Sequence, residues 1–211
     1  MPTSNSHPVF ARLYPRISRG AERSGGAEHR RRLLAGLEGR VIEVGAGHGL
    51  NFAHYPPSVT QVVAVEPEPR LRGLAVKAAD GAPVPVEVRD GTAEALPAQD
   101  GEFDAAVASL VLCSVPDQAT ALRELARVVR SGGELRFYEH VVSNRPASAR
   151  IQRALDATVY PFLAGGCHCA RDTGAAIREA GFQVLSEERF GFKPGRIEPA
   201  IPHILGTARR P

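Results

Sequence analysis

A glycine loop, EVGAGHG at residues 43–49, follows the apolar pair Val41-Ile42. Glycines have no side chain, so backbone N–H groups can approach a ligand closely, and a following helix adds its positive end. The pattern predicts a nucleotide-like cofactor where a strand ends. A dinucleotide fingerprint has glycine at its first, third and sixth positions, whereas Gly49 is the fifth residue here and Leu50 the sixth, which argues against NAD. A tight turn that binds nothing is the alternative interpretation.

Glu66 ends the next apolar run, residues 61–65, and is followed by Pro67. It lies about twenty residues beyond the glycine loop, where doubly wound folds place a carboxylate that accepts hydrogen bonds from both ribose hydroxyls. A 2′-phosphate would be repelled by this carboxylate, so NADP is disfavoured as well. The alternative interpretation is a solvated loop carboxylate.

Length and composition indicate one unit. With 211 residues, 43% of them hydrophobic, the chain can bury a substantial core, and we expect a single domain over residues 1–211. The net charge of +3 is small and spread along the chain, so no nucleic-acid partner is indicated. The only basic run, residues 30–32, lies among leucines, which favours a solvated helix face.

The ends of the chain and its cysteines bear on the compartment. The N-terminus has no apolar stretch of signal-peptide length, and the apolar, uncharged run at residues 105–116 is too short to span a bilayer. Three cysteines fit no disulfide framework. We therefore expect a cytoplasmic protein with no stable membrane anchor. Residues 1–20 contain three prolines and predict a partly ordered arm rather than a folded element.

Strands and helices are expected to alternate along the chain. Short apolar segments bounded by Gly, Pro or Asp predict strands at 40–44, 61–66, 84–89, 103–109 and 134–139. Helices are predicted at 117–130, capped by Asp117 and stopped by the Ser-Gly-Gly at 131–133, and at about 172–180. Two last strands, near 183–190 and 203–208, are expected to pair with each other. The order predicts an open α/β sheet with ligand contacts at the carboxyl ends of its strands.

Four blocks of sequence carry a family resemblance. They are EVGAGHG at 43–49, VVAVEP at 62–67, GTAEALP at 91–97, and FDAAVASLVLCSV at 103–115 paired with ELARVVRSGGELRFYEHV at 124–141. In this order they resemble class I methyltransferases that depend on S-adenosyl-L-methionine and release S-adenosyl-L-homocysteine. The resemblance implies a Rossmann-like fold, a seven-stranded and mostly parallel sheet with an antiparallel final strand and helices on both faces.

The resemblance also implies roles for residues in those blocks. The glycine loop would surround the methionine part of the cofactor with Gly45, Ala46, Gly47 and Gly49. Glu66 with Pro67 would hold the ribose, Leu71 would pack on the adenine, and Thr92 and Ala93 would meet the adenine edge. The methionine amino group would lie by Ser109 and Leu110, Glu43 would orient the glycine loop, and Asn51 is a further candidate. Many relatives have an acidic residue in place of Thr92, so this contact would rest on backbone or hydroxyl.

A narrower resemblance concerns the methyl acceptor. This chain is similar to small methyltransferase-like enzymes that S-methylate alkyl thiols in the segments LVLCSV, FYEHV, Gly166-Cys167, AGF at 180–182 and PHILGTA at 202–208. We find no counterpart in this sequence to the membrane-anchoring N-terminal helix of those enzymes. The LCSVPD stretch also resembles bacterial enzymes that methylate the amine of phospholipids. We expect a small lipophilic acceptor, with a thiol favoured and a phospholipid or small amine as the alternative. A protein that binds the cofactor without turnover is the alternative of another class.

The candidates for the acceptor site are Tyr14, Cys113, His140 and Tyr160. A thiol reacts as thiolate, and His140, leaving the fifth strand, would be its base, unless it only satisfies backbone groups there. Cys113 has the usual position of a small buried hydrophobe.

The cysteine run at 167–169 lacks the spacers of zinc sites, so no metal is expected, and arsenite methylation through cysteine thiols is a minor alternative. Residues 142–170 contain a helical pattern and would either close over the acceptor or cover a sheet edge.

Overall fold

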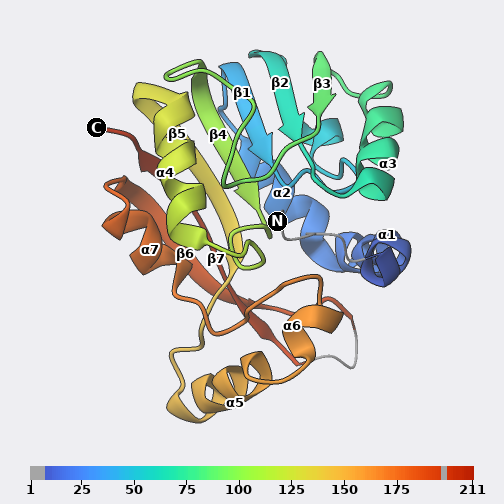
Figure 1. Cartoon of the computed structure of the whole chain (residues 1–211), viewed down its shortest axis with the longest axis vertical. Helices are drawn as coiled ribbons and strands as arrows, with labels where there is room; N and C mark the ends of the chain where they lie inside the picture. Colours follow the sequence, from blue (N-terminus) through green and yellow to red (C-terminus); the bar gives the residue numbers. More distant parts are fainter. Residues whose placement is uncertain (1–7, 196–198) are drawn as a thin grey trace.

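The computed structural model describes residues 8–195 and 199–211 and contains one seven-stranded sheet in the order β3-β2-β1-β4-β5-β7-β6 (Figure 1). The strands are β1 Gly39–Val44, β2 Val59–Val65, β3 Val86–Arg89, β4 Phe103–Ser109, β5 Val129–His140, β6 Gln183–Phe192 and β7 Ile201–Arg209. β7 runs antiparallel to both of its neighbours, β5 and β6, and the other strands are parallel. The predicted Rossmann-like methyltransferase fold is confirmed.

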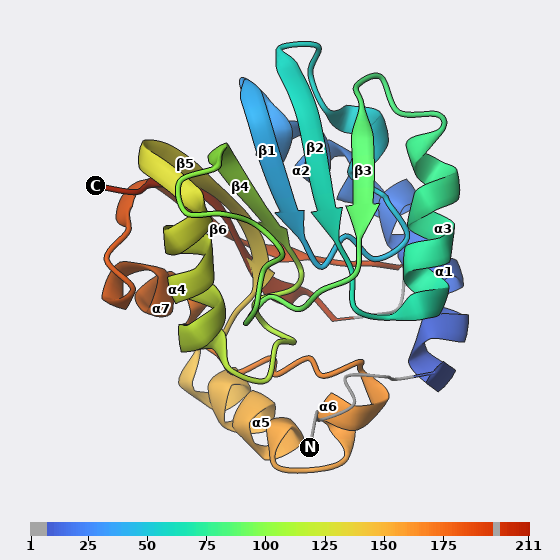
Figure 2. The ribbon, with the colours of Figure 1, turned by 45° about the horizontal axis from the view of Figure 1, so that its top comes forward.

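Helices cover both faces of the sheet (Figure 2). On one face, α2 (Ala27–Leu34) and α3 (Pro69–Ala79) contribute to a core that includes Val41 and Val62. On the other face, α4 (Gln118–Val128) and α7 (Thr173–Glu179) pack over Ile42 and Val63. Neighbouring residues of one strand thus belong to opposite cores, because side chains alternate along a strand. This explains why the central strands are apolar throughout.

The predicted stop of the helix at 117–130 is wrong. Asp117 caps α4 as expected, since its side chain accepts a hydrogen bond from the backbone N–H of Thr120 at 3.0 Å. The helix ends at Val128, however, and β5 begins at Val129, so the Ser-Gly-Gly at 131–133 lies inside the strand. A Cβ on Gly133 would lie 2.6 Å from the carbonyl oxygen of Asp104. This glycine serves the close approach of β5 to β4, and does not end the helix.

The prediction of a partly ordered arm at residues 1–20 is wrong for its described part. Pro8–Ala21 form helix α1, with Pro15 inside it. Ala11 is fully buried, and the rings of Phe10 and Tyr14 stack with centroids 4.9 Å apart. Packing of this apolar face outweighs the cost of an internal proline. A kink in η1 (Glu22–Gly26), where Gly25 has a φ of 121°, connects α1 to α2.

Residues 142–170 contain α5 (Pro146–Asp156) and α6 (Tyr160–Leu163). Together with α1 they gather at the end of the sheet toward which the strand arrows point, the carboxyl ends of the parallel strands (Figure 1). A Cβ on Gly165 would lie 2.6 Å from the ring of Phe10, so the segment after α6 contacts α1. Among the described residues, no helix has both the length and the apolar character needed to cross a bilayer.

Candidate active site

Two loops meet at the centre of the sheet, where β1 and β4 lie side by side. β1 leads to β2 on one side and β4 leads to β5 on the other, so strand order reverses here, which is where open α/β sheets bind ligands. A Cβ on Gly45, in the loop after β1, would lie 2.3 Å from Cγ2 of Val111, in the loop after β4. Gly45 also has a φ of 65°. Only glycine allows the two loops to come this close.

Glu66 follows β2 directly and is buried. Its carboxylate accepts hydrogen bonds from the backbone N–H of Gly47 at 2.7 Å and of Glu68 at 2.9 Å. Burial raises the pKa of this carboxyl to about 7, although the two N–H groups act in the other direction. Each oxygen keeps a further lone pair. Glu66 therefore fastens the glycine loop and can still accept from a ligand, and its ribose role stays a prediction.

The amides of the glycine loop are already bonded within the protein. Those of Gly45 and Ala46 both donate to the carbonyl of Val65, at 2.8 and 3.1 Å, and that of Gly49 donates to Ala46 at 3.0 Å. The loop therefore allows close approach of its backbone without offering these N–H groups to a ligand. This differs from the chemistry expected of the motif.

Arg30 is a functional candidate that the sequence analysis missed, because the run 30–32 was predicted to be a solvated face. Arg30 is buried, while Arg31 on the same helix is exposed. Its guanidinium donates to Glu22 at 2.8 Å, to Asn51 at 2.8 Å and to Ser109 at 3.0 Å. A buried cation thus spans the glycine loop and the end of β4. The signal was its spacing to the buried Leu33 and Leu34, which places the three residues on one face of α2.

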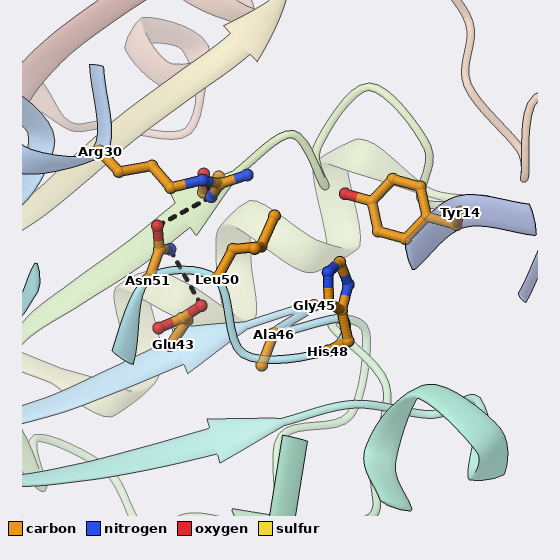
Figure 3. Close-up of a pocket in the computed structure, with 9 residues that line it drawn as sticks. Tyr14, Arg30, Glu43, Gly45, Ala46, His48, Leu50 and Asn51 are labelled. Atoms are coloured by element: carbon orange, nitrogen blue, oxygen red, sulfur yellow. Dashed lines mark hydrogen bonds between the residues drawn. The ribbon is translucent and has the colours of Figure 1, made fainter. Parts of the chain in front are cut away.

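Glu43 is connected to the guanidinium of Arg30 through the side chain of Asn51. Its carboxylate accepts from the side chain of Asn51 at 3.0 Å and from the hydroxyl of Tyr55 at 2.7 Å. Burial raises the pKa of Glu43 to about 7. Figure 3 shows the resulting chain from Glu43 through Asn51 to Arg30.

A cavity lies between the glycine loop and helix α1. It has a volume of about 10 Å³, roughly the space of one water molecule. The side chain of Tyr14 reaches from α1 over the loop, with its ring 5.5 Å from that of His48 and its hydroxyl directed into the cavity (Figure 3). The lining residues are Tyr14, Arg30, Glu43, Gly45, Ala46, His48, Leu50, Asn51 and Ser109. Tyr14, predicted for the acceptor, thus lies on the glycine loop.

His48 presents an unpaired acceptor beside this cavity. Burial lowers its pKa to about 4, so the ring is neutral at physiological pH. The hydroxyl of Ser18 donates to the carbonyl of Tyr14 at 2.7 Å, so its oxygen accepts from Nε2 of His48 at 3.3 Å. Nδ1 then carries a lone pair, and it is buried with no partner among the described residues. Such an atom fits a ligand that donates a hydrogen bond.

The remaining cofactor candidates lie at the ends of β2 and β3. Leu71 is buried in the first turn of α3, and its N–H donates to the side chain of Glu68 at 2.8 Å. Thr92 forms a single bridge with Ala95. Ala93 is packed into the core on the α4 face. Pro67 offers its carbonyl to Arg72 at 3.0 Å.

The loop after β4 is held in a strained conformation. Leu110 has a φ of 58°, a value that costs about 1 to 2 kcal/mol for a residue with a side chain. The buried carboxylate of Glu139 accepts the N–H groups of Val111, Leu112 and Cys113, at 3.0, 3.0 and 3.1 Å. Glu139 was not among the predicted site residues, and it imposes this geometry on the loop. Strain of this kind concentrates at functional sites.

His140, the last residue of β5, lies between two cysteines. Its Nδ1 is 3.8 Å from Sγ of Cys113 and 3.4 Å from Sγ of Cys167. A hydrogen bond with Cys113 lowers the pKa of the Cys167 thiol to about 5. Burial, and then the nearby Cys167, raises the pKa of Tyr160 to about 12. Cys113 and His140, two of the four acceptor candidates, are thus in contact, and Cys113 is buried as its sequence position predicts. Their role toward an acceptor stays a prediction.

The chain matches known proteins in sequence. A model of the methyltransferase domain covers residues 42–137. Thiol S-methyltransferase TMT1B of Homo sapiens is 33% identical over 181 residues, which are 83% of this chain and 73% of that protein. Phosphatidylethanolamine N-methyltransferase of Cereibacter sphaeroides is 32% identical over 118 residues, 56% of this chain and 58% of that protein.

The fold also matches solved structures. The structure of a SAM-dependent methyltransferase of Thermotoga maritima, described as a possible histamine N-methyltransferase, superposes with a TM-score of 0.70. The match covers 96% of this chain and 98% of that one at 23% sequence identity. At this identity the similarity concerns the fold.

Proposed function

Because the chain belongs to the S-adenosylmethionine-dependent methyltransferases, we propose that it transfers the methyl group to a small lipophilic thiol. One observation carries the proposal. The loop at 110–113 touches the glycine loop through Val111 and faces His140 and a second cysteine through Cys113. The side of the site next to the donor is therefore formed by sulfur and imidazole, and the relative from Homo sapiens is named a thiol S-methyltransferase.

The residues around the glycine loop fit the cofactor. Arg30 would bind the methionine carboxylate, and the unpaired Nδ1 of His48 would accept from the ammonium group beside Ser109. Glu66 would accept from the ribose hydroxyls through its remaining lone pairs. The cavity has room for about one water molecule, so side chains that line it, Tyr14 among them, would shift when the cofactor enters.

The chemistry needs little from side chains. The cofactor supplies a methyl group on a sulfonium, whose departure needs no further activation, so alignment and exclusion of water are the main tasks. Helix α1 serves the second task, because it contacts both the glycine loop through Tyr14 and the 164–166 segment through Phe10. The acceptor thiol has to be present as thiolate. His140 is the group that we place beside it.

A phospholipid or small amine is the second candidate acceptor. It is supported by the similarity to phosphatidylethanolamine N-methyltransferase over 118 residues. The buried carboxylate beside Cys113, that of Glu139, already accepts three backbone N–H groups, however, which leaves it little capacity to stabilise an ammonium. This favours a neutral or anionic sulfur over an ammonium precursor.

An acceptor screen tests the proposal. The protein is incubated with labelled S-adenosylmethionine and with alkyl thiols of increasing chain length, small amines, phosphatidylethanolamine vesicles, phenols or arsenite, and S-adenosylhomocysteine is measured. We expect thiol-dependent product, with kcat/KM rising with alkyl chain length because the acceptor is lipophilic. Product that depends on amines or vesicles, and not on thiols, would contradict the thiol and support the second candidate.

A further inference from the structure

We propose that Cys113, His140 and Cys167 together bind one zinc ion. The three residues come from the loop after β4, the end of β5 and the loop before α7. One ligand atom from each lies within 4.8 Å of the other two. Two thiolates and an imidazole are typical ligands of zinc, and two thiolate charges neutralise the ion where it is buried.

The distances agree with a tetrahedral site. Zinc binds thiolate sulfur at about 2.3 Å and imidazole nitrogen at about 2.0 to 2.1 Å, so a tetrahedral angle puts sulfur and nitrogen about 3.6 Å apart. The measured separations from Nδ1 of His140 are 3.4 Å to Cys167 and 3.8 Å to Cys113. Shifts of about 0.2 Å in the sulfur positions would therefore give both sulfur–nitrogen separations of a tetrahedral zinc site.

The ligand positions are held by contacts that do not involve the ligand side chains. The backbone N–H of His168 donates to the carbonyl of Cys113 at 2.8 Å. A Cβ on Gly166 would lie 2.6 Å from the carbonyl oxygen of Ser114, so the two loops touch at a glycine. Glu139 fixes the N–H of Cys113. The two cysteines are thus brought together by the fold, as a site formed before the metal binds requires.

The run at 167–169 contributes only its first residue. Sγ of Cys169 lies 3.3 Å from a carboxylate oxygen of Asp156, away from His140. The sequence argument against a metal concerned the close spacing within this run. It does not apply to ligands from three separate segments, and it leaves Cys169 as a matched control.

Three protein ligands leave the fourth tetrahedral position open, which is typical of catalytic zinc. Resting on the proposed function, we infer that the acceptor thiol binds there and loses its proton to solvent, because a thiol that coordinates zinc is deprotonated. The sulfur lone pair then forms the new bond to the methyl carbon while the bond from that carbon to the sulfonium breaks. The products are a thioether and S-adenosylhomocysteine, and His140 acts as a metal ligand in place of a base.

Metal content and Co²⁺ spectroscopy test the site on the chain of 211 residues. The protein is purified under reducing conditions without a metal-binding tag, and zinc is quantified by mass spectrometry. We expect one zinc per chain, and after exchange with Co²⁺ a thiolate-to-metal charge-transfer band with the strong visible absorption of tetrahedral cobalt. Cys113→Ser and Cys167→Ser should weaken Zn²⁺ affinity at least tenfold, as should His140→Gln, which serves if a serine variant does not fold. In Cys169→Ser, the Zn²⁺ affinity should stay within threefold of that of the wild type.

The outcomes separate the metal site from the acceptor. Absence of stoichiometric zinc and of the cobalt spectrum in folded, reduced protein would overturn the site, and so would an equal loss of affinity in Cys169→Ser. These readouts need no acceptor, so zinc binding without thiol turnover leaves the site standing and contradicts the proposed function. Equal thiol turnover by metal-free and zinc-loaded protein would overturn the open-position role, whereas loss that zinc restores would support it.

Discussion

The donor side and the acceptor side of this molecule are built in different ways. On the donor side, the glycine loop and Glu66 are joined by a hydrogen bond between residues 19 apart in the chain, directly after adjacent strands. On the acceptor side, Cys113, His140 and Cys167 come from three segments, and Phe10 of α1 contacts Gly165, close in sequence to Cys167. The donor side is thus encoded by a local motif, whereas the acceptor side depends on long-range packing. Substitutions should therefore separate cofactor binding from acceptor turnover.

The largest effect is expected where the two sides touch, at Gly45. Gly45→Ala combines a φ of 65° with a Cβ that would lie 2.3 Å from Val111. We expect a loss of about 2 to 5 kcal/mol in the free energy of unfolding and of measurable cofactor binding. Gly47→Ala is the control, because its φ of 59° is similar and its nearest atom is 3.5 Å away. It should lose only about 1 to 2 kcal/mol. Equal losses in denaturant titrations would show that the loop contact is unimportant.

Substitution of Arg30 tests whether cofactor binding also depends on a residue outside the glycine loop. Arg30→Lys keeps the charge and loses the fork that reaches Asn51 and Ser109. We expect cofactor affinity to fall by about 1.5 to 3 kcal/mol, the value of hydrogen bonds to a charged group, as measured by calorimetry. Arg31→Lys, at an exposed neighbour, should leave affinity unchanged. An unchanged Kd for the cofactor in Arg30→Lys would show that Arg30, and with it α2, does not contribute to cofactor binding.

The same contrast explains what could be predicted from the sequence. Alternating apolar segments and the motif blocks predicted the sheet and the positions of its strands along the chain, because every central strand is buried on both faces. The arm at 1–20 was mispredicted, since its helix depends on packing against the loops that it covers. Arg30 was predicted to be exposed to solvent because it belongs to the basic run at 30–32, and only its spacing to the neighbouring leucines indicated that it is buried. The cysteine cluster has no local pattern, because its members meet only in the folded chain.

The next largest effect on cofactor affinity is expected at Glu66. Glu66→Ala should weaken cofactor binding by about 1 to 3 kcal/mol, since it leaves ribose hydroxyls unpaired. Gln99 is exposed, and only its backbone N–H donates to the carboxylate of Glu102, so Gln99→Ala is a control that should not change affinity. Unchanged affinity in Glu66→Ala would contradict the ribose assignment.

The pH dependence of Glu66 has opposite signs for binding and for stability. Its pKa is raised to about 7 by burial. Ribose hydroxyls need the carboxylate as acceptor, so cofactor affinity should fall about tenfold per pH unit below 7 and be constant well above it. The folded protein holds this proton more tightly than the unfolded chain, so its contribution to stability is present at low pH and is lost as pH rises through 7. Glu66→Gln should flatten the affinity profile. A wild-type affinity that is independent of pH between 5.5 and 8 would contradict this assignment.

The smallest effect concerns the acceptor side alone and decides whether the two sides are separable. Gly166→Ala would place a Cβ 2.6 Å from the carbonyl oxygen of Ser114 at a φ of 91°, so the segment that carries Cys167 has to move away from Cys113. We expect thiol kcat/KM to fall about tenfold, or 1.4 kcal/mol, with cofactor Kd unchanged. Gly181→Ala has the same φ of 91° with no atom within 4 Å of its Cβ, so it measures the backbone strain alone. If both variants lose the same turnover, backbone strain alone accounts for the loss and the contact with Ser114 is unimportant. If Gly166→Ala weakens cofactor binding as well, the two sides are mechanically coupled and acceptor geometry cannot be changed without the donor.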